Sequence, residues 1–378
     1  MQNSGRARDF AACAFFLAYI VTPSLFSALR SEAAPVALPG VGPPAEFPPP
    51  PSNPYEWSQW SRAVEKWHFE RLGLRPTLAR VNNYVKIWAL EASPMPRIAI
   101  GPSHWIFATG YDIDAWRGAD PFTAEELDAW QRCLESRSSE LEKRGIRYCC
   151  VLAPGKAAVY PEYLPENYRS GGPSRADELA AHLERCSSFR FLDPRADLLE
   201  EKRRDQDDDY LYFPLGFHWN DRGTLACSRS IVAHLLPAFP ALATVDDSHD
   251  VEIAADDPGD TWAEALFLPD LLTQTVRRVV FRDDAQRALR FTEEPELNRV
   301  TVDQADSSLP KAVVFHDSFG LRMPRILGRH FSHAVFVLER EFDVELLERE
   351  KPDVVVQIIS DRALARRHYP HSVFVWNP

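Results

Sequence analysis

Short apolar segments alternate with amphipathic segments along most of the chain, and this alternation restricts the fold more than any other feature. Helical patterns begin at Thr123 and Ser174, whereas residues 146–152, 311–315 and 353–359 have the composition of buried strands. Strands that alternate with helices in this way are typical of a mostly parallel sheet with helices on both faces. The sequence therefore predicts a three-layer α/β fold.

Helix caps give some of the element boundaries. Thr123 and Glu126 have the spacing of a capping box, and Gly145 is suited to end the helix that they start. Asn220 or Asp221 is expected to cap a further helix, because both side chains accept hydrogen bonds from the first turn of a helix. These caps divide the chain into elements of ordinary length.

Residues 55–378 are expected to form one domain. The remaining elements of the alternating pattern are strands over 189–192, 210–213 and 334–338, and helices from about 319 and over 343–350. Residues 237–310 break the pattern, because they are acidic and lack a clear period. We therefore expect this stretch to be an irregular insertion between elements of the core.

The first 54 residues differ in composition from the rest. Arg6 and Arg8 precede an apolar run over 10–29, which is typical of an export signal or a single membrane anchor. Residues 35–54 contain nine prolines and predict a stiff, extended spacer. We therefore expect a signal peptide or anchor over 1–34 and a linker over 35–54, with the domain just outside a membrane.

The chain has a formal charge of -12, which lies entirely in residues 55–378. An acidic domain repels the phosphate backbone, so the composition argues against a nucleic-acid partner. The cysteines lack the CxxC spacing of a zinc site. A metal site built from His104, His218, His316 and Asp317 is an alternative, but these spacings match no ordinary metal motif.

The sequence HDSFG at 316–320 carries the first chemical signal. It lies where the strand over 311–315 ends and a helix is expected to begin, so Ser318 would project from the carboxyl edge of the sheet. Backbone N–H groups of the first helical turn point to the same place, which provides a nucleophile and part of an oxyanion hole. The alternative is a cap alone, with Asp317 supporting the turn.

The sequence GFHWNDRG at 216–223 carries the second signal. His218 follows a short strand and precedes a helix, and with Ser318 it would supply the general base of a nucleophilic site. A third group should orient the imidazole. In an extended segment the residue two positions earlier shares its face, but that residue is Gly216, which has no side chain.

Five segments resemble motifs of the alginate O-acetyltransferase AlgJ/AlgX family, and they stand in the same order. They are IGPSHWIF at 100–107, VLAPGKAAVYPEYLP at 151–165, GFHWNDRG at 216–223, HDSFG at 316–320 and EREKPDVVVQIISDRAL at 348–364. Three positions depart from the family. His104 and His316 replace glycines, and Gly216 replaces the aspartate two residues before the histidine.

The resemblance implies an SGNH-hydrolase-like fold and a cell-envelope enzyme, in the periplasm or anchored to the inner membrane, that acetylates an exported polysaccharide. Ser318 would carry the acyl group, His218 would be its base, and Asp317, Trp219 and Asn220 would support them. No organic cofactor is implied, and a membrane-embedded acyltransferase would deliver the acetyl group. The competing functions are a carbohydrate esterase and a non-catalytic carbohydrate-binding or scaffold subunit of an export assembly.

Gly216 leaves three interpretations of the site open. Another acid, one of Asp207 to Asp209 or Asp221, could orient His218. A Ser–His dyad could instead transfer acyl groups slowly, since loss of the acid costs a triad on the order of 10⁴ in turnover. The third interpretation is a protein that keeps the fold and only binds carbohydrate.

Some residues are weaker candidates for substrate contact. Trp105 and Trp219 could stack on sugar rings or belong to the core, and Lys156 lies at a strand end where α/β sites usually form. Three arginines follow the nucleophile at helical spacing: Arg322, Arg325 and Arg329. They would form either a solvated stripe or a local basic surface that receives an anionic chain.

Overall fold

The computed structural model describes residues 21–22, 46–70, 75–168, 171–205, 208–245 and 247–365. The expected signal or anchor over 1–34 and most of the linker over 35–54 lie outside these ranges, apart from the two residues at 21–22 and the last part of the linker. No helix within the described ranges is both long enough and apolar enough to cross a membrane.

The described residues fall into two compact units. We call the first the helical unit; it contains the described residues before Met95 and the segment Trp262–Leu272. The second, the sheet unit, contains residues 95–261 and the described residues from 273 onward. The expected active-site residues all belong to the sheet unit.

In the helical unit, the elements are η1 (Pro54–Glu56), α2 (Trp57–Glu70) and α3 (Arg75–Trp88). Helix α3 holds the separate segment Trp262–Leu272 through polar contacts. Asn83 donates a hydrogen bond to the carbonyl of Leu266 (2.9 Å), and Arg80 makes a two-pronged ion pair with Asp270 (2.6 and 2.7 Å).

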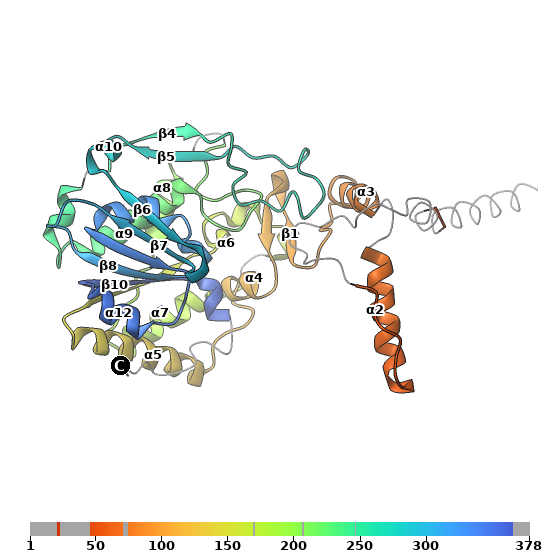
Figure 1. Cartoon of the computed structure of the whole chain (residues 1–378), viewed down its shortest axis with the longest axis horizontal. Coiled ribbons are helices and arrows are strands. Elements are labelled where there is room, and N and C mark those ends of the chain that lie inside the picture. Colours follow the sequence, from red (N-terminus) through yellow and green to blue (C-terminus); the bar gives the residue numbers. More distant parts are fainter. Residues whose placement is uncertain are drawn as a thin grey trace, which may run out of the picture. The chain divides into compact units, whose positions relative to one another are not determined.

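The sheet unit is built on a six-stranded sheet in the order β3-β10-β8-β9-β7-β6 (Figure 1). The strands are β3 (Arg147–Ala153), β10 (Val354–Ser360), β8 (Lys311–His316), β9 (His333–Val337), β7 (Arg299–Asp303) and β6 (Arg290–Glu294). The first four are parallel, and β7 and β6 add to them in antiparallel fashion. The sheet is therefore mixed, with a parallel core around β8.

Helices cover both faces of this sheet (Figure 1). On one face lie α5 (Ala124–Glu142), α7 (Arg175–Cys186) and α12 (Val344–Glu350), and on the other lie α8 (Arg195–Lys202) and α9 (Asp221–Leu235). Side chains alternate between two apolar clusters along the four parallel strands: Cys150 packs with the α5 side and Cys149 with the α9 side. The three-layer α/β fold is therefore confirmed.

The remaining elements of the sheet unit outside residues 237–310 are short. They are β1 (Ile98–Ile100), η2 (Pro102–His104), β2 (Ile106–Ala108), α4 (Tyr111–Trp116), α6 (Lys156–Val159), η3 (Pro161–Tyr163), η4 (Glu166–Tyr168), η7 (Ser318–Gly320), α11 (Met323–Ile326), η8 (Gly328–His330) and η9 (Asp361–Ala365). Several of them form the loops at the carboxyl edge of the parallel strands, where α/β proteins usually place their sites.

The expected helix caps are present. The Thr123 side chain accepts from the N–H of Glu126, and the Glu126 side chain accepts from the N–H of Thr123, which completes the capping box of α5. Asn220, rather than Asp221, caps α9, because its side chain accepts from the N–H groups of Arg222 and Gly223. These contacts fix where both helices begin.

Three expected elements differ from the structure. Residues 189–192 contribute only one bridge, from Leu192 to Val151, and residues 210–213 contribute one from Tyr212 to Trp219. The helix expected from about 319 is instead the single turn η7 followed by the short α11. Proline at the start of α11 cannot donate a helical hydrogen bond, so a continuous helix is interrupted there.

Residues 237–310 contain regular structure where we expected an irregular insertion. They form η5 (Pro240–Thr244), β4 (His249–Ile253), β5 (Arg277–Phe281), α10 (Asp284–Arg287), β6, η6 (Pro295–Leu297) and β7. Strands β4 and β5 pair with each other, whereas β6 and β7 extend the main sheet. Strand β6 could not be recognised in the sequence, because this edge strand is largely exposed and lacks an apolar face.

Candidate active site

The site forms where β8 ends. Ser318 is exposed in the turn that follows the strand, and Asp317 holds this turn in place. One oxygen of Asp317 accepts the N–H of Phe319 (3.0 Å), and the other accepts both the N–H (2.8 Å) and the hydroxyl (2.7 Å) of Ser360 at the end of β10. Because Asp317 is buried, these bonds fix the nucleophile turn to the neighbouring strand.

The structure brings Ser318 and His218 together. Ser318 Oγ lies 2.9 Å from His218 Nε2, and the edge of the imidazole packs against the ring of Phe319. Trp219 is buried beside them and donates its indole N–H to the carbonyl of Phe319 (2.8 Å). Trp219 therefore ties the loop before α9, residues 214–220 (the histidine loop), to the turn at residues 317–320 (the nucleophile turn). It has no ring face free for a sugar.

The third member of the site is Asp260, which the sequence analysis missed. Its Oδ2 lies 2.7 Å from His218 Nδ1 and also accepts the N–H groups of Phe217 (2.5 Å) and His218 (2.9 Å). Burial by itself would raise the pKa of Asp260, but the hydrogen bond and charge of His218 and the backbone donors lower it to about 2. The carboxylate is therefore ionised, as orientation of a histidine requires.

Gly216 explains how Asp260 reaches this position. A Cβ atom at residue 216 would lie 2.2 Å from the carbonyl oxygen of Asp260 and 2.4 Å from its carboxyl carbon. Asp260 therefore occupies the space that a side chain at 216 would need. Asp260 therefore compensates for the glycine at 216. The chain lacks the aspartate expected two residues before His218, and the carboxylate of Asp260, from a distant loop, occupies the place of that missing side chain.

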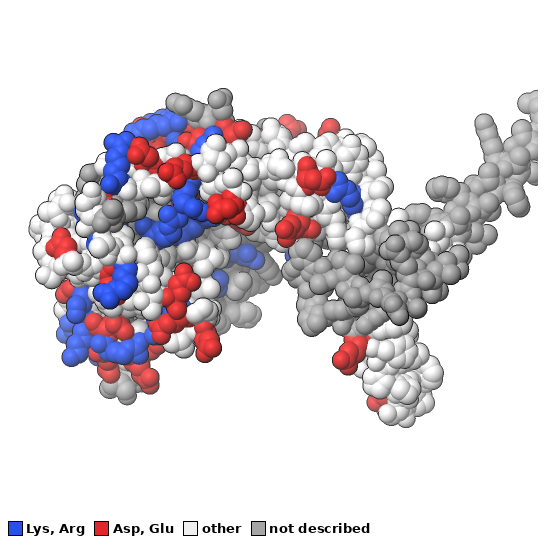
Figure 2. Space-filling model, turned by 45° about the horizontal axis from the view of Figure 1, so that its top comes forward, with Lys and Arg blue, Asp and Glu red and all other residues white. Residues whose placement is uncertain are grey.

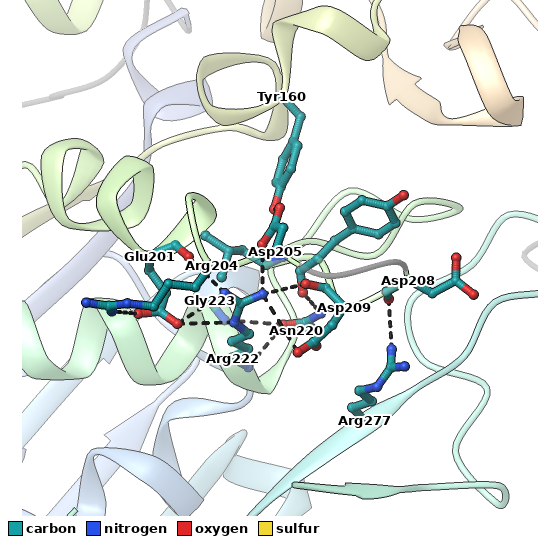
Figure 3. A network of polar contacts seen from close by, with 12 residues as sticks. Tyr160, Glu201, Arg204, Asp205, Asp208, Asp209, Asn220, Arg222, Gly223 and Arg277 are labelled. Atoms are coloured by element: carbon teal, nitrogen blue, oxygen red, sulfur yellow. Dashed lines mark hydrogen bonds and ion pairs between the residues drawn. The ribbon is translucent and has the colours of Figure 1, made fainter.

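The substitute acids suggested by the sequence lie at other places than the Asp260 position beside His218, and most of their carboxylates pair with arginines. Figure 3 shows that Arg222 lies among Glu201, Asp205 and Asp209, while Asp208 contacts Arg277 through its carbonyl. Asp221 binds Arg322 (2.7 Å) and the N–H of Val279. Asp207 lies outside the described residues. The acid that orients His218 is thus Asp260. Neither the suggested substitute acids nor a Ser–His dyad without an acid describes the site.

His316 lies beneath the nucleophile turn, where the resemblance expects a glycine. Its side chain is buried, and its Nδ1 is 2.7 Å from the carbonyl of Asp317. A Cβ at Gly320 would come within 2.2 Å of the imidazole, so the absence of a side chain at 320 makes room for this ring. Burial lowers the pKa of His316, which indicates a neutral packing residue.

A pocket of about 190 Å³ opens beside Ser318 and His218. Its apolar wall includes Phe107, Ile113, Trp116, Phe217 and Phe319, and Arg340 and Arg362 also line it. The volume is below the usual range of about 300 to 1,000 Å³ for drug-sized ligands. It therefore suits a small acyl group better than a large cofactor.

The weaker substrate candidates are buried or held by other residues. Trp105 is 2% exposed and stacks on Tyr163, with 4.0 Å between ring centroids, so it belongs to the core. Lys156 is also buried, although it lines the pocket. Arg322 is bound by Asp221 and Asp257.

The expected arginine stripe does not form. Arg329 is fully buried, pairs with Asp283 and lies over the ring of Phe281, so only Arg325 is exposed and Arg322 is half-buried. Figure 2 shows acidic and basic side chains intermixed on one face of the sheet unit. The three arginines therefore do not create a basic surface next to the nucleophile.

The alternative metal site also lacks support. His104 lies in η2, whereas His218 and His316 lie in the histidine loop and at the end of β8. Among the described residues, no group of three or more histidine, cysteine or acidic side chains could hold a metal ion.

A serine at the end of a central parallel strand, with a histidine and a carboxylate from loops earlier in the chain, defines an SGNH-hydrolase-like α/β protein. The family model of this class that matches is described as "SGNH hydrolase-like domain, acetyltransferase AlgX", and it covers residues 98–294. The chain belongs to this ALGX family, as its motifs suggested. The matched range includes His218 and Asp260 and ends before Ser318.

Solved structures of similar fold include PatB1 of Bacillus cereus, at 14% identity and a TM-score of 0.49, covering 74% of this chain and 99% of that one. The O-acetyltransferase domain of Pseudomonas putida AlgJ has 16% identity and a TM-score of 0.47, with 72% and 94% covered. Pseudomonas aeruginosa AlgX has 13% identity and a TM-score of 0.43, with 71% and 63% covered. No curated protein sequence matches the chain.

Proposed function

We propose that this protein is an O-acyltransferase of the cell envelope, which transfers acetyl groups to hydroxyls of an exported polysaccharide through an acyl-Ser318 intermediate. The observation that carries this proposal is the continuous hydrogen-bonded series from Ser318 through His218 to Asp260 at the pocket. Membership of a family described as an acetyltransferase supports the choice of acetyl as the transferred group.

The reaction has two half-reactions. His218 Nε2 accepts the hydroxyl proton of Ser318 as Oγ attacks the acetyl carbonyl of the donor, and the imidazolium then protonates the leaving alcohol. In the second half, His218 accepts the proton of a sugar hydroxyl, which attacks the acyl-serine. The ester bond to Ser318 breaks, and His218 returns the proton to Oγ.

Asp260 and the nucleophile turn stabilise these steps. Asp260 accepts Nδ1–H of His218, fixes the tautomer with a free Nε2 and balances the positive charge that develops on the ring. Two N–H groups of the turn already donate within it, that of Phe319 to the Asp317 side chain and that of Gly320 to the Asp317 carbonyl. We assign the N–H of Ser318 to the developing oxyanion.

The partners and location follow from the same proposal. The acceptor is a polysaccharide, the acetyl donor is a membrane-embedded acyltransferase, and no organic cofactor takes part. Residues 1–34 serve as signal or anchor and residues 35–54 as linker. These features keep the sheet unit outside the inner membrane.

A carbohydrate esterase is the second candidate, because it needs the same three residues with water as acceptor. The exposure of Ser318 favours this alternative, since water reaches the acyl-serine. The scaffold interpretation depended on a missing acid, and Asp260 removes that reason.

The test uses the full chain and p-nitrophenyl acetate as acyl donor, with and without a neutral oligosaccharide. We expect an acetylated protein by intact-mass analysis, no adduct in Ser318→Ala, and turnover lower by on the order of 10⁴ in Asp260→Asn. Asp256→Asn is the matched control, because the Asp256 side chain is 84% exposed. Acetylated oligosaccharide supports the transferase, acetate alone supports the esterase, and equal activity in Ser318→Ala excludes both.

A further inference from the structure

Lys156 is a buried cation that the proposed reaction does not use. It follows β3 at the start of α6, and its side chain is 4% exposed. The ammonium lies 4.7 Å from the ring centroid of Phe107 and 5.1 Å from that of Trp105. These rings close off one side of the ammonium, so its hydrogen bonds must be made on the other.

Three backbone carbonyls accept those hydrogen bonds. Lys156 Nζ is 2.9 Å from the oxygen of Phe213, 3.0 Å from that of Pro214 and 2.6 Å from that of Gly216. An ammonium has three donors, so all of them are used. The oxygens of Phe213 and Pro214 also accept the N–H groups of Gly216 and Ile106, whereas Lys156 is the donor to the oxygen of Gly216. Without the cation, three carbonyl oxygens that converge on one point would repel one another and that of Gly216 would lose its hydrogen bond, so the loop would shift at Gly216.

This loop leads directly into the active site. The residue after Gly216 is Phe217, and the N–H groups of Phe217 and His218 both donate to Asp260. Gly216 is held from two sides, by Lys156 at its carbonyl oxygen and by Asp260 where a Cβ would stand. A shift of the Gly216 peptide therefore changes the position of His218 relative to both Asp260 and Ser318.

We propose that Lys156 is a positioning residue, which fixes the loop Phe213–Gly216 and thereby holds His218 between Asp260 and Ser318. This inference rests on the proposed function for its kinetic test but not for its structural test. Burial strongly lowers the pKa of Lys156, while the negative charge of Asp260 acts in the opposite direction. The three converging carbonyl oxygens match the three N–H donors of an ammonium, so the geometry favours the charged form that burial disfavours.

The kinetic test compares Lys156→Met with Lys143→Met, since Lys143 is 62% exposed, follows the last residue of α5 and does not line the pocket. In Lys156→Met we expect kcat for p-nitrophenyl acetate to fall by about 10²-fold with KM almost unchanged, because misplacement of a catalytic group by about 1 Å costs this much. In Lys156→Ala, added ethylammonium should restore part of kcat. A rise in KM with kcat unchanged would instead make Lys156 a substrate contact and overturn the inference.

The structural test needs no activity. The Nδ1 proton of His218 bound to Asp260 should give a downfield ¹H NMR signal that is absent from Asp260→Asn and His218→Ala. We expect this signal in Lys143→Met and its loss in Lys156→Met. If Lys156→Met does not fold, Lys156→Gln, which keeps two donors, is measured in its place.

An unchanged signal in the folded Lys156 variant overturns the inference even if the wild type has no acyltransfer activity. Conversely, a wild type with the downfield signal but no acyl-serine would contradict the proposed function and leave the positioning role to be judged by the NMR comparison alone.

Discussion

At the scale of the residue, the absence of a Cβ atom at position 216 allows the carboxylate of Asp260 to reach His218. Glycine at 216 leaves the space that Asp260 occupies, and any side chain there would meet both the backbone and the carboxyl group of Asp260. This glycine is needed for space and not for a left-handed backbone, since its φ lies outside the positive range in which glycine is favoured.

Gly216→Ala is therefore expected to displace Asp260. We expect a loss of about 1 to 3 kcal/mol in the free energy of unfolding, as for other overpacked sites, together with a lower kcat. Urea denaturation and the acetyl ester assay measure the two effects. Gly172→Ala is the control, because a Cβ at 172 meets nothing within 4 Å. Equal values for both variants would show that Asp260 does not require the space at 216.

Asp260 also predicts how stability depends on pH. Its pKa is lowered to about 2 in the folded chain, against an unfolded value of about 3.9. Its contribution, roughly 2 kcal/mol, is fully present above the unfolded pKa and is lost as the pH falls through about 2. The difference in unfolding free energy between wild type and Asp260→Asn should therefore be constant above about pH 5 and shrink between about pH 4 and pH 2. In Asp256→Asn the difference from wild type should be small at every pH.

Among the secondary-structure elements, the turn η7 depends on its cap more than a long helix does, since it has only three residues. We expect Asp317→Ala to cost more than the usual value of about 1 kcal/mol for a helix cap, because Ser360 loses its partner as well. Thr123→Ala, which removes the cap of α5, should cost about 1 kcal/mol and leave kcat unchanged. A normal kcat in Asp317→Ala would mean that Ser318 holds its position without the cap.

Besides the Asn220 cap, the ion pairs of Arg222 fix the start of α9. Arg222 is half-enclosed by Glu201 and Asp205, at 3.1 and 2.7 Å, and it also binds the carbonyl of Asp209 (Figure 3). Tyr160 adds a hydrogen bond to Asp205 and accepts one from the N–H of Leu211. This network holds residues 201–205 and 208–211 against the helix that follows His218.

Removing Arg222 would leave the partly buried Asp205 without its ion-pair partner and Glu201 with only the exposed Arg204. Arg222→Met is therefore expected to reduce the free energy of unfolding by about 3 kcal/mol or more. Arg203→Met is the matched control, since Arg203 is 75% exposed and should contribute little. Comparable urea midpoints for the two variants would contradict the role of the network.

The elements that the sequence predicts best are those with a clear apolar period or cap. Strands β3, β8 and β10 have continuous apolar segments, and the caps of α5 and α9 are set by local side chains. Strand β6 could not be predicted, because its exposed faces carry no apolar pattern. Residues 189–192 have strand composition, but only Leu192 pairs with the sheet. How many residues of such a segment pair depends on tertiary contacts, which the local sequence does not reveal.

At the scale of the whole molecule, Ser318 and His218 could be paired from sequence because each stands just before a helix or helical turn and their side chains together supply a nucleophile and a base. Asp260 could not be found in this way. It stands 42 residues from His218, in a stretch without a motif, and only the fold brings the two together. The one signal was the missing side chain at 216, which showed that an acid was needed without showing where it was.

Thiol chemistry provides a measure of global unfolding. The five cysteines of the described residues are free, and Cys186 alone among them is exposed. Burial raises the pKa of Cys150 to about 12 and that of Cys149 and Cys227 further. We expect Ellman's reagent to label Cys186 quickly in the native protein and the buried thiols only on unfolding. Cys186→Ser should remove the fast phase, and its persistence would indicate that a buried thiol is open to solvent.

Because Gly216 and Asp260 depend on each other, substitutions at these two positions should be coupled in evolution. Gly216→Asp alone would harm the site, because the new side chain would collide with Asp260. Replacement of Asp260 alone would also harm it, because glycine at 216 cannot orient His218. Selection should therefore retain both residues or exchange both. Descendants of this lineage would carry intact enzymes that a search for aspartate two positions before the histidine would classify as degenerate.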